Sequence, residues 1–550
     1  MVYRIVFALL CVATLAGAQT DSSNLPVTRA MVIDGEQLIG LHFSDAKRDS
    51  MLGDLKDQRT NYENLRKIPL DNSVPPAILF NPIPVGMRFE SERKPFVMSP
   101  SPALAAPKNI EDLAFSSVGE LGALLKAKKI TSVQLTKMYI DRLKKYGPRL
   151  QCVITLMEDY ALQQAQKADE EIAAGKYRGP LHGIPYGAKD LLATKGAKTT
   201  WGSVPYKEQY INRDATVIKR LEQAGAVLVA KLTMGELAWG DVWFGGMTRN
   251  PWNLQQGSSG SSAGSAAATA AGLVGFAIGT ETYGSIVSPS TRCGATGLRP
   301  TYGRVSRTGA MALSWSMDKI GPICRTVEDC ALVFNAIYGP DGEDQTLYDV
   351  PFNYTPDVQL KDLRIGYLKA DFDSAKWNKA NNDSTLSKLR SLGATLIPVE
   401  LPRFPYEDMS IILSAEAGAA FDQLTRSGKD DLMVRQIRNA WPNVFRASRF
   451  IPAVEYIQAN RIRYLAIQEM AKLMERVDIY IAPSLEGENT LVTNLTGHPC
   501  VVLPNGWTKE GTPTSITFIG QLFGEAKLLA AAKRYQDATG FHLKHPHLPD

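Results

Sequence analysis

The sequence predicts an α/β fold in which helices cover a β-sheet. Helical patterns such as residues 118–147 alternate with short β-rich runs at residues 226–231 and 500–504, and this alternation is typical of helices packed on a sheet. The chain has 550 residues, of which 44% are hydrophobic and 21% are charged, with a mean hydropathy of −0.14. This composition excludes disordered, collagen-like and polytopic membrane proteins.

Charge and cysteine content exclude two further classes of protein. The 61 basic and 56 acidic side chains give a net charge of +5 and are scattered along the chain, so we do not expect binding to nucleic acid through charge. The six cysteines are widely spaced and form neither a CxxC motif nor a zinc-binding pattern. We therefore expect no disulfide framework and no metal site.

The first 18 residues have the organisation of a signal peptide. Arg4 precedes an apolar run from Ile5 to Leu15, and Ala16 and Ala18 form a small-residue cleavage site. The run is shorter than the ~20 residues that cross a bilayer, so we predict a cleaved signal peptide at residues 1–18 and a secreted or periplasmic protein. The uncharged stretch at residues 254–280 is too polar in its first half for a stable membrane span.

Residues 19–108 are predicted to form an N-terminal helical extension and a Pro-rich linker. Ser44 can cap a helix whose apolar residues recur at helical spacing, namely Met51, Leu52, Leu55, Tyr62 and Leu65. Prolines are then frequent at residues 75–84 and 99–107, as in a linker. We place the start of the catalytic domain at residue 109 and extend it to residue 550.

The segment from Gly257 to Pro300 is the most unusual part of the sequence. Its Gly and Ser residues are also typical of a flexible linker, but they continue into an apolar run and a second Gly/Thr/Ser loop that ends at Ser285. Glycines allow backbone N–H groups to approach a ligand, and an oxyanion hole needs such donors. The segment therefore favours a packed site.

A serine nucleophile needs a base, and the sequence offers several. Ser262 lies in a GxSxG motif, which would need an Asp or Glu and then a downstream histidine such as His498, but residues 250–259 show no strand character ahead of it. If the base is a histidine, the candidates are His182 and His498. Ser44 and Lys47 spell SxxK without the companion motifs, so capping by Ser44 is the simpler account.

The third candidate base is Lys189, in LHGIPYGAKD. Burial among small neutral groups would lower its pKa and make it a base. A solvated lysine paired with the adjacent Asp190 is the alternative, and the residues alone leave both open.

A dense, ordered series of motifs resembles the amidase signature family from about residue 110 to 506. It includes GIPYGAKD, TTWGS, DATV, KLTMGELAWG, NPWNL, GSSGSSAGSAAA, GTETYGSI, GLRPTYGRVSRTGA, SMDKIGP and NLTGHPCVVLP. The resemblance implies a large mixed β-sheet core covered on both faces by α-helices. Amidotransferase A subunits of this family typically read DTGGSIR, whereas Glu281, Tyr283 and Val287 give ETYGSIV here. This form is closest to the peptide amidase or secreted amidase branch, and the bulk of Tyr283 beside the nucleophile bears on the shape of the pocket.

The resemblance also implies a Ser-cisSer-Lys triad. Ser285 would be the nucleophile, Ser261 the bridging serine after a cis peptide bond, and Lys189 the base. Oxyanion and substrate contacts would come from the nucleophile loop and its neighbour, namely Thr282, Tyr283, Gly284 and Ser262. No cofactor or metal is implied.

The predicted function is hydrolysis of the C–N bond of a small-molecule or peptide amide through an acyl-enzyme, which releases a carboxylate and ammonia or an amine. An amidotransferase A-type subunit is an alternative, but it would need the cytosol and partner subunits, which the signal peptide disfavours. A nonenzymatic exported binding protein is disfavoured because all three triad positions are filled. A monomer and a homodimer are both compatible with the sequence.

Overall fold

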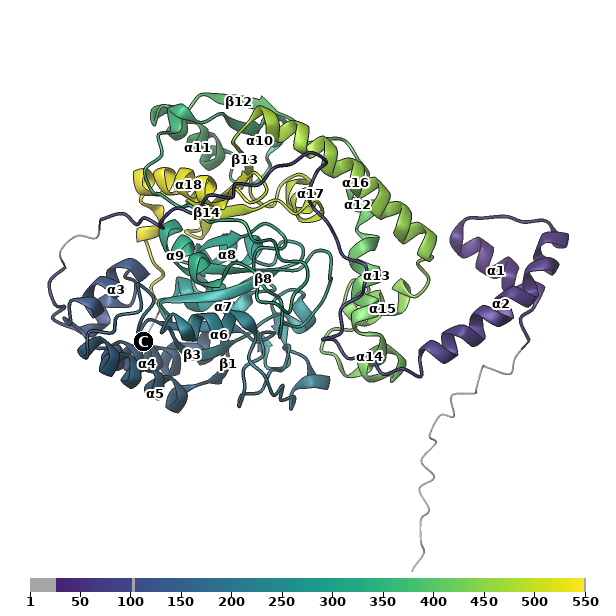
Figure 1. Cartoon of the computed structure of the whole chain (residues 1–550), viewed down its shortest axis with the longest axis horizontal. Helices are drawn as coiled ribbons and strands as arrows, with labels where there is room; N and C mark the ends of the chain where they lie inside the picture. The colour runs from purple at the N-terminus through teal and green to yellow at the C-terminus, as the bar shows by residue number, and fades with distance from the viewer. Residues whose placement is uncertain (1–25, 101–103, 549–550) are drawn as a thin grey trace, which may run out of the picture. The chain divides into compact units, whose positions relative to one another are not determined.

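The computed structural model describes residues 26–100 and 104–548 (Figure 1). The predicted signal peptide lies outside the described residues. The chain divides into two compact units, the first ending at Asp71 and the second beginning at Asn72. The sequence-predicted start of the catalytic domain at residue 109 lies inside the second unit.

The first unit is built on two helices, α1 (Arg29–Ile39) and α2 (Asp45–Leu65). The buried Arg48 of α2 lies 2.7 Å from Glu36 of α1 and so joins the two helices. The predicted helix after Ser44 is confirmed, but the Ser44 side chain makes no capping hydrogen bond. Two members of the predicted apolar stripe, Tyr62 and Leu65, are exposed.

The second unit contains an eleven-stranded sheet, with the strand order β1-β3-β2-β8-β10-β9-β14-β15-β13-β11-β12. Parallel pairs such as β2 with β3 and β8 stand beside antiparallel pairs such as β14 with β15, which confirms a mixed sheet. The strands are β1 (Val153–Leu156), β2 (Pro185–Lys189), β3 (Val227–Leu232), β8 (Phe276–Glu281), β9 (Thr296–Arg299), β10 (Lys319–Cys324), β11 (Ile365–Leu368), β12 (Leu396–Val399), β13 (Ile479–Pro483), β14 (Cys500–Trp507) and β15 (Pro513–Gly520).

Helices and two small hairpins complete this unit. The hairpins pair β4 (Val242–Trp243) with β5 (Gly246–Met247) and β6 (Arg249–Asn250) with β7 (Asn253–Gly257). The helices are α3 (Val118–Lys126), α4 (Ser132–Leu150), α5 (Glu158–Ala173), α6 (Thr216–Gln223), α7 (Ala263–Ala270), α8 (Val287–Cys293), α9 (Val327–Ile337), α10 (Lys369–Ser374), α11 (Lys379–Ser391), α12 (Tyr406–Met409), α13 (Ile411–Ala420), α14 (Asp422–Arg426), α15 (Trp441–Ser448), α16 (Ala453–Arg476), α17 (Asn489–Thr496) and α18 (Glu525–Thr539).

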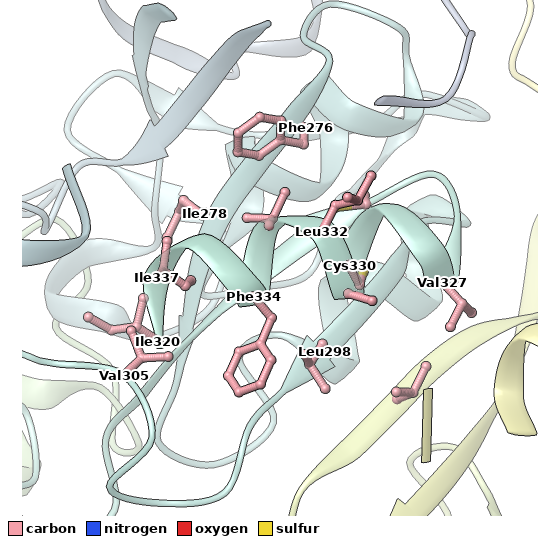
Figure 2. Close-up of a cluster of buried hydrophobic side chains, with 14 of the residues drawn as sticks. Phe276, Ile278, Leu298, Val305, Ile320, Val327, Cys330, Leu332, Phe334 and Ile337 are labelled. Atoms are coloured by element: carbon pink, nitrogen blue, oxygen red, sulfur yellow. The ribbon is translucent and has the colours of Figure 1, made fainter. Parts of the chain in front are cut away.

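Alternate residues of the central strands enter different cores, so helices cover both faces of the sheet. Phe276 and Ile278 of β8 belong to a core that includes Phe334 of α9, as Figure 2 shows. Between them, Ala277 enters a separate core with Ala267 of α7. Because successive side chains of a strand point to opposite faces, α9 and α7 lie on opposite sides of the sheet.

The predicted elements are found with small changes. The β-rich runs form β3 and β14, and the helical pattern at residues 118–147 forms two helices, α3 and α4, instead of one. The second begins after Thr131, whose side chain and that of Gln134 form a capping box. Among the described helices, none combines the length and the apolar character of a membrane-spanning segment.

Candidate active site

Lys189 ends β2 within the large sheet, and its side chain is fully buried. Its Nζ lies 2.8 Å from Ser261 Oγ, 2.8 Å from Thr280 Oγ1 and 3.1 Å from Ser262 Oγ. Among the described residues, no carboxylate forms an ion pair with this amine. Three hydroxyl groups therefore surround a lysine that has lost contact with water.

Burial dominates the protonation of Lys189. Desolvation lowers its pKa from 10.5 to about 7, against the opposing effect of the charges of Asp318 and Glu281. The alternative of a solvated lysine paired with Asp190 is wrong, because Asp190 binds the buried Lys231 at 2.9 Å. Asp190 also accepts hydrogen bonds from the backbone and side chain of Thr200. The two adjacent residues thus belong to separate networks.

Ser261 and Ser262 lie directly before α7. The peptide bond between Gly260 and Ser261 is cis, and Ser262 is the N-cap residue of α7. Ser262 Oγ donates to the carbonyl of Thr280 and accepts from its N–H, both at 3.0 Å. Its remaining lone pair can accept a hydrogen bond from Lys189. The hydroxyl of Ser262 is therefore fully engaged by the protein.

The expectation that no strand precedes the GxSxG motif was wrong. Residues 253–257 form β7, which pairs with β6 in a hairpin apart from the main sheet. The polar side chains of this strand do not show the apolar pattern that predicts a strand, since a short hairpin depends on main-chain pairing more than on an apolar face. The saturated hydroxyl of Ser262 still argues against a nucleophile at that position.

The nucleophile loop, residues 282–285, connects β8 to α8. Its turn uses Gly284 at a φ of +83°, a conformation that favours glycine. In the described part of the chain, no protein acceptor takes the backbone N–H groups of Tyr283, Gly284 or Ser285. The Ser285 side chain is 7% exposed. The loop therefore offers backbone donors beside a hydroxyl group, as an oxyanion hole requires.

Hydrogen bonds join the loop that contains Ser261 and Ser262 to the nucleophile loop. The N–H of Ser262 donates to the carbonyl of Ser285 at 3.1 Å. The hydroxyl of Thr282 donates to Asp318 at 2.5 Å, and burial raises the pKa of Asp318. The structure thus brings Lys189, Ser261 and the Ser285 loop to one place.

Glu281 anchors the nucleophile loop from behind, a role that the sequence did not reveal. Its carboxylate accepts hydrogen bonds from the N–H groups of Ile286 and Val287, from Arg299 at 2.7 Å and from Asn494 at 2.9 Å. Burial raises the pKa of Glu281, but Arg299, Asn494 and the backbone donors more than offset it and bring the pKa to about 2. The only sequence signal was its place in the ETYGSI motif.

The other candidate bases lie elsewhere. Lys47 is exposed on α2 in the first unit, which leaves the SxxK motif without a buried site. His182 accepts from the N–H of Arg178 and pairs with Glu171 at 3.2 Å. His498 lies 2.8 Å from the hydroxyl of Thr496, and burial lowers its pKa to about 3. Both imidazoles are therefore held by groups outside the triad positions.

A cavity of about 1180 Å³ opens beside the site. Thr280 and Thr282 form part of its wall, together with apolar residues such as Leu191, Met311 and Ile320. Its volume exceeds the ~300–1,000 Å³ of common small-molecule sites. Tyr283 is not among the residues that line the cavity, and it is 41% exposed. The bulky tyrosine therefore leaves this cavity open.

Comparison with known proteins assigns the chain to a family. The family model Amidase matches residues 134–529. The A subunit of glutamyl-tRNA(Gln) amidotransferase from Coxiella burnetii is 34% identical over 481 residues, covering 78% of this chain and 99% of the relative. Its counterpart from Marinomonas sp. is 35% identical over 478 residues, covering 78% of this chain and 98% of the relative.

A solved structure is also similar to this chain. Native peptide amidase from Stenotrophomonas maltophilia has a TM-score of 0.72 and 30% identity, with 80% of this chain and all of that chain covered. The region matched by the family model, residues 134–529, contains Lys189 and both serine loops. The chain therefore belongs to the Amidase family of amide-hydrolysing enzymes.

Proposed function

We propose that this protein hydrolyses carboxylic acid amides with Ser285 as nucleophile, Ser261 as proton relay and Lys189 as base. The observation that carries the proposal is the buried amine of Lys189, 2.8 Å from Ser261 Oγ and without a carboxylate partner among the described residues. A lysine with a pKa of about 7 is neutral in a large fraction of molecules at neutral pH. Such an amine can accept a proton.

The hydrogen bonds around Lys189 suit this direction of transfer. Ser262 already donates to Thr280, so the Lys189 amine donates to Ser262 and keeps its lone pair for the hydroxyl of Ser261. As Ser285 Oγ attacks the amide carbon, its proton passes to Ser261, and the proton of Ser261 passes to Lys189. The same route returns a proton to the leaving nitrogen, so ammonia or an amine departs and an ester on Ser285 remains.

A water molecule then attacks the ester and loses a proton through Ser261 to Lys189, and the return of this proton to Ser285 Oγ releases the carboxylate. The negative oxygen of each tetrahedral intermediate would accept from the N–H groups of the nucleophile loop, for which Tyr283, Gly284 and Ser285 provide donors. Thr282 and Ser262 would position this loop, through Asp318 and the Ser285 carbonyl respectively.

The substrate class and the location are part of the proposal. The similarity to a peptide amidase supports a peptide or small-molecule amide as substrate, and the signal-peptide pattern of residues 1–18 supports a secreted or periplasmic enzyme. The curated relatives support a second candidate, glutamine hydrolysis in an amidotransferase complex. That activity would require partner subunits for ammonia transfer.

A substitution at Ser285 tests the mechanism. Ser285→Ala should lower kcat on an aryl amide by about 10⁴-fold or more, because the acyl-enzyme cannot form. A fluorophosphonate should label the wild-type protein on Ser285 alone. The Ser262→Ala variant should still be labelled on Ser285. Full turnover by Ser285→Ala would remove this serine from the mechanism. Turnover of glutamine but not of aryl amides would favour the amidotransferase function.

A further inference from the structure

Residues 72–81 cross the cavity beside the active site, and we call them the strap. They precede the region that the family model matches, yet Asn72, Pro75, Ile78 and Phe80 line the cavity together with Thr280 of the active site. The strap is part of the second unit and forms no β-strand or helix. Its course over the cavity must therefore be fixed by individual contacts.

Polar and aromatic contacts hold the strap at both ends. At one end, the Asn72 side chain binds both backbone groups of Ala312: it donates to the carbonyl at 2.8 Å and accepts from the N–H at 2.7 Å. At the other end, Phe80 lies under the guanidinium of Arg463 at 3.5 Å and packs edge-on against Tyr302 at 5.0 Å. These contacts fix the strap to separate parts of the cavity wall.

Between its two ends, the strap presents apolar side chains. Ile78 is 82% exposed and Leu79 is 44% exposed, and both line the cavity. Pro75 and Pro76 stiffen this stretch and remove two backbone donors. When an apolar ligand covers apolar side chains that are held in place but exposed, the burial of their surface stabilises the complex. The strap therefore adds an apolar wall to which a ligand can bind.

The carboxylates that line the cavity are engaged by the protein, whereas the cationic Arg461 is exposed and donates to the neutral Gln458. Arg307 pairs with Asp344, Arg463 donates to Ser316, and Glu416 accepts from Ser314 and Tyr456. A small zwitterion such as glutamine would need charges that are free to pair with its ammonium and carboxylate groups. The engaged carboxylates offer no free partner to the ammonium group, and the apolar wall instead suits an amide with a large uncharged substituent.

We infer that the strap selects amides with an extended alkyl or aryl group, which enters the cavity against Ile78 and Leu79. This inference rests on the proposed function, because it assigns the cavity to the substrate of the Lys189 and Ser285 site. The group could belong to the acyl or to the amine side of the scissile bond, and reagents that extend each side separately distinguish the two.

Alkyl fluorophosphonates provide the test, because they label the nucleophile without a known substrate. One reagent carries a dodecyl group on phosphorus, in place of the acyl chain, and another carries it on the alkoxy oxygen, in place of the amine. The methyl analogue of each is the reference. We expect the rate of Ser285 labelling to rise with chain length for one of the two reagents, by about fourfold for each of the first methylenes that enter the cavity.

Variants of the strap should remove this preference. Ile78→Ser combined with Leu79→Ser should slow labelling by the dodecyl reagent at least tenfold and leave labelling by the methyl reagent unchanged. Asn72→Ala should act in the same direction, since it frees one end of the strap. Val85→Ser is the matched control, because Val85 is 79% exposed just beyond the strap and does not line the cavity.

The outcomes separate this inference from the proposed function. The labelling rate of the Ile78 and Leu79 double variant could depend on chain length as in the wild type, with the label still on Ser285. This result would overturn the inference about the strap and leave the proposed function intact. Equal labelling by methyl and dodecyl reagents in the wild type would do the same. Labelling on another serine would instead contradict the proposed function.

Discussion

The surroundings of Lys189 control whether its amine is charged. Three hydroxyl oxygens surround the buried amine, and no described carboxylate pairs with it. Its neighbour Asp190, which could have kept it charged, binds Lys231 instead. An ordinary lysine would be protonated at neutral pH. Burial thus converts a common surface residue into a candidate base.

The pH dependence of hydrolysis follows from this pKa. Only the neutral amine accepts a proton, so kcat/KM should fall by about tenfold per pH unit below the pKa of about 7 and reach a plateau above it. Lys189→Ala should lose most activity and flatten this limb. The measurement is kcat/KM on an aryl amide from acidic to alkaline pH.

A histidine base would also titrate near pH ~6.5, so the position of the limb does not distinguish the two mechanisms. The matched controls are His182→Gln and His498→Gln, which should leave the midpoint and the slope unchanged because both imidazoles have other partners. If either variant lost the pH dependence of kcat/KM below pH 7, the result would favour a Ser/His mechanism.

Glu281 should be important for stability as well as for the position of the loop. Glu281→Gln leaves the buried Arg299 without its counter-charge, which costs about 3–5 kcal/mol of unfolding free energy. Because the pKa of Glu281 falls from 4.5 to about 2 on folding, its stabilisation is complete above pH 4.5 and is lost as the pH falls towards 2. Urea unfolding at neutral and acidic pH measures both effects.

The control for Glu281 is Glu208→Gln, which breaks an exposed ion pair with Lys198. Exposed pairs contribute little, so this variant should unfold at the same urea concentration as the wild type. Equal midpoints for both variants would show that Glu281 does not anchor the loop.

At the scale of elements, α7 determines where Ser261 and Ser262 lie. Its residues are all small and buried, which lets the helix pack tightly between α4, α8 and β8. Gly264, in its first turn, donates its N–H to the carbonyl of Thr233 at 2.9 Å. A close backbone approach therefore fixes the beginning of the helix, and with it Ser261 and Ser262.

Gly264→Ala should disturb this position. The new Cβ would lie 2.5 Å from both the Cys152 carbonyl oxygen and the Thr233 nitrogen, which are backbone atoms that cannot yield easily. We expect a loss of about 1–3 kcal/mol in stability and a lower kcat in the folded fraction. Thermal unfolding and steady-state kinetics measure the two effects.

The same substitution in α3 is the control. Gly119→Ala places its Cβ 3.5 Å from Met98, an ordinary contact, and alanine is the better helix former. This variant should be at least as stable as the wild type with unchanged kcat. A fully active and stable Gly264→Ala protein would contradict the tight fit of α7.

At the scale of the whole molecule, the chain combines a predicted leader, a two-helix unit and a large unit that holds the candidate site. We expect export to leave a mature protein that begins near Gln19, because Ala16 and Ala18 give the A-x-A pattern before it. N-terminal sequencing of the exported protein checks this. Retention of Met1 in that fraction would exclude cleavage.

The alternation of helical and β-rich patterns predicted the α/β class, and the resemblance of the motifs to the amidase signature family implied the family and the candidate triad positions. They did not show whether Lys189 is solvated, and they did not reveal the β7 strand among polar residues. They also gave no reason to connect Glu281 with Arg299 or with Asn494, which lies 213 positions away from Glu281 in the chain.

These remaining points required the folded structure, since most of them depend on contacts between distant segments. Asp190 has a partner on β3, Lys189 has partners beside α7 and on β8, and the strap reaches a cavity formed by residues hundreds of positions later. Burial and the choice of partner set the pKa of a side chain. Neither property is local in the sequence, which is why motifs indicated the candidate reactive residues and folding determined their surroundings.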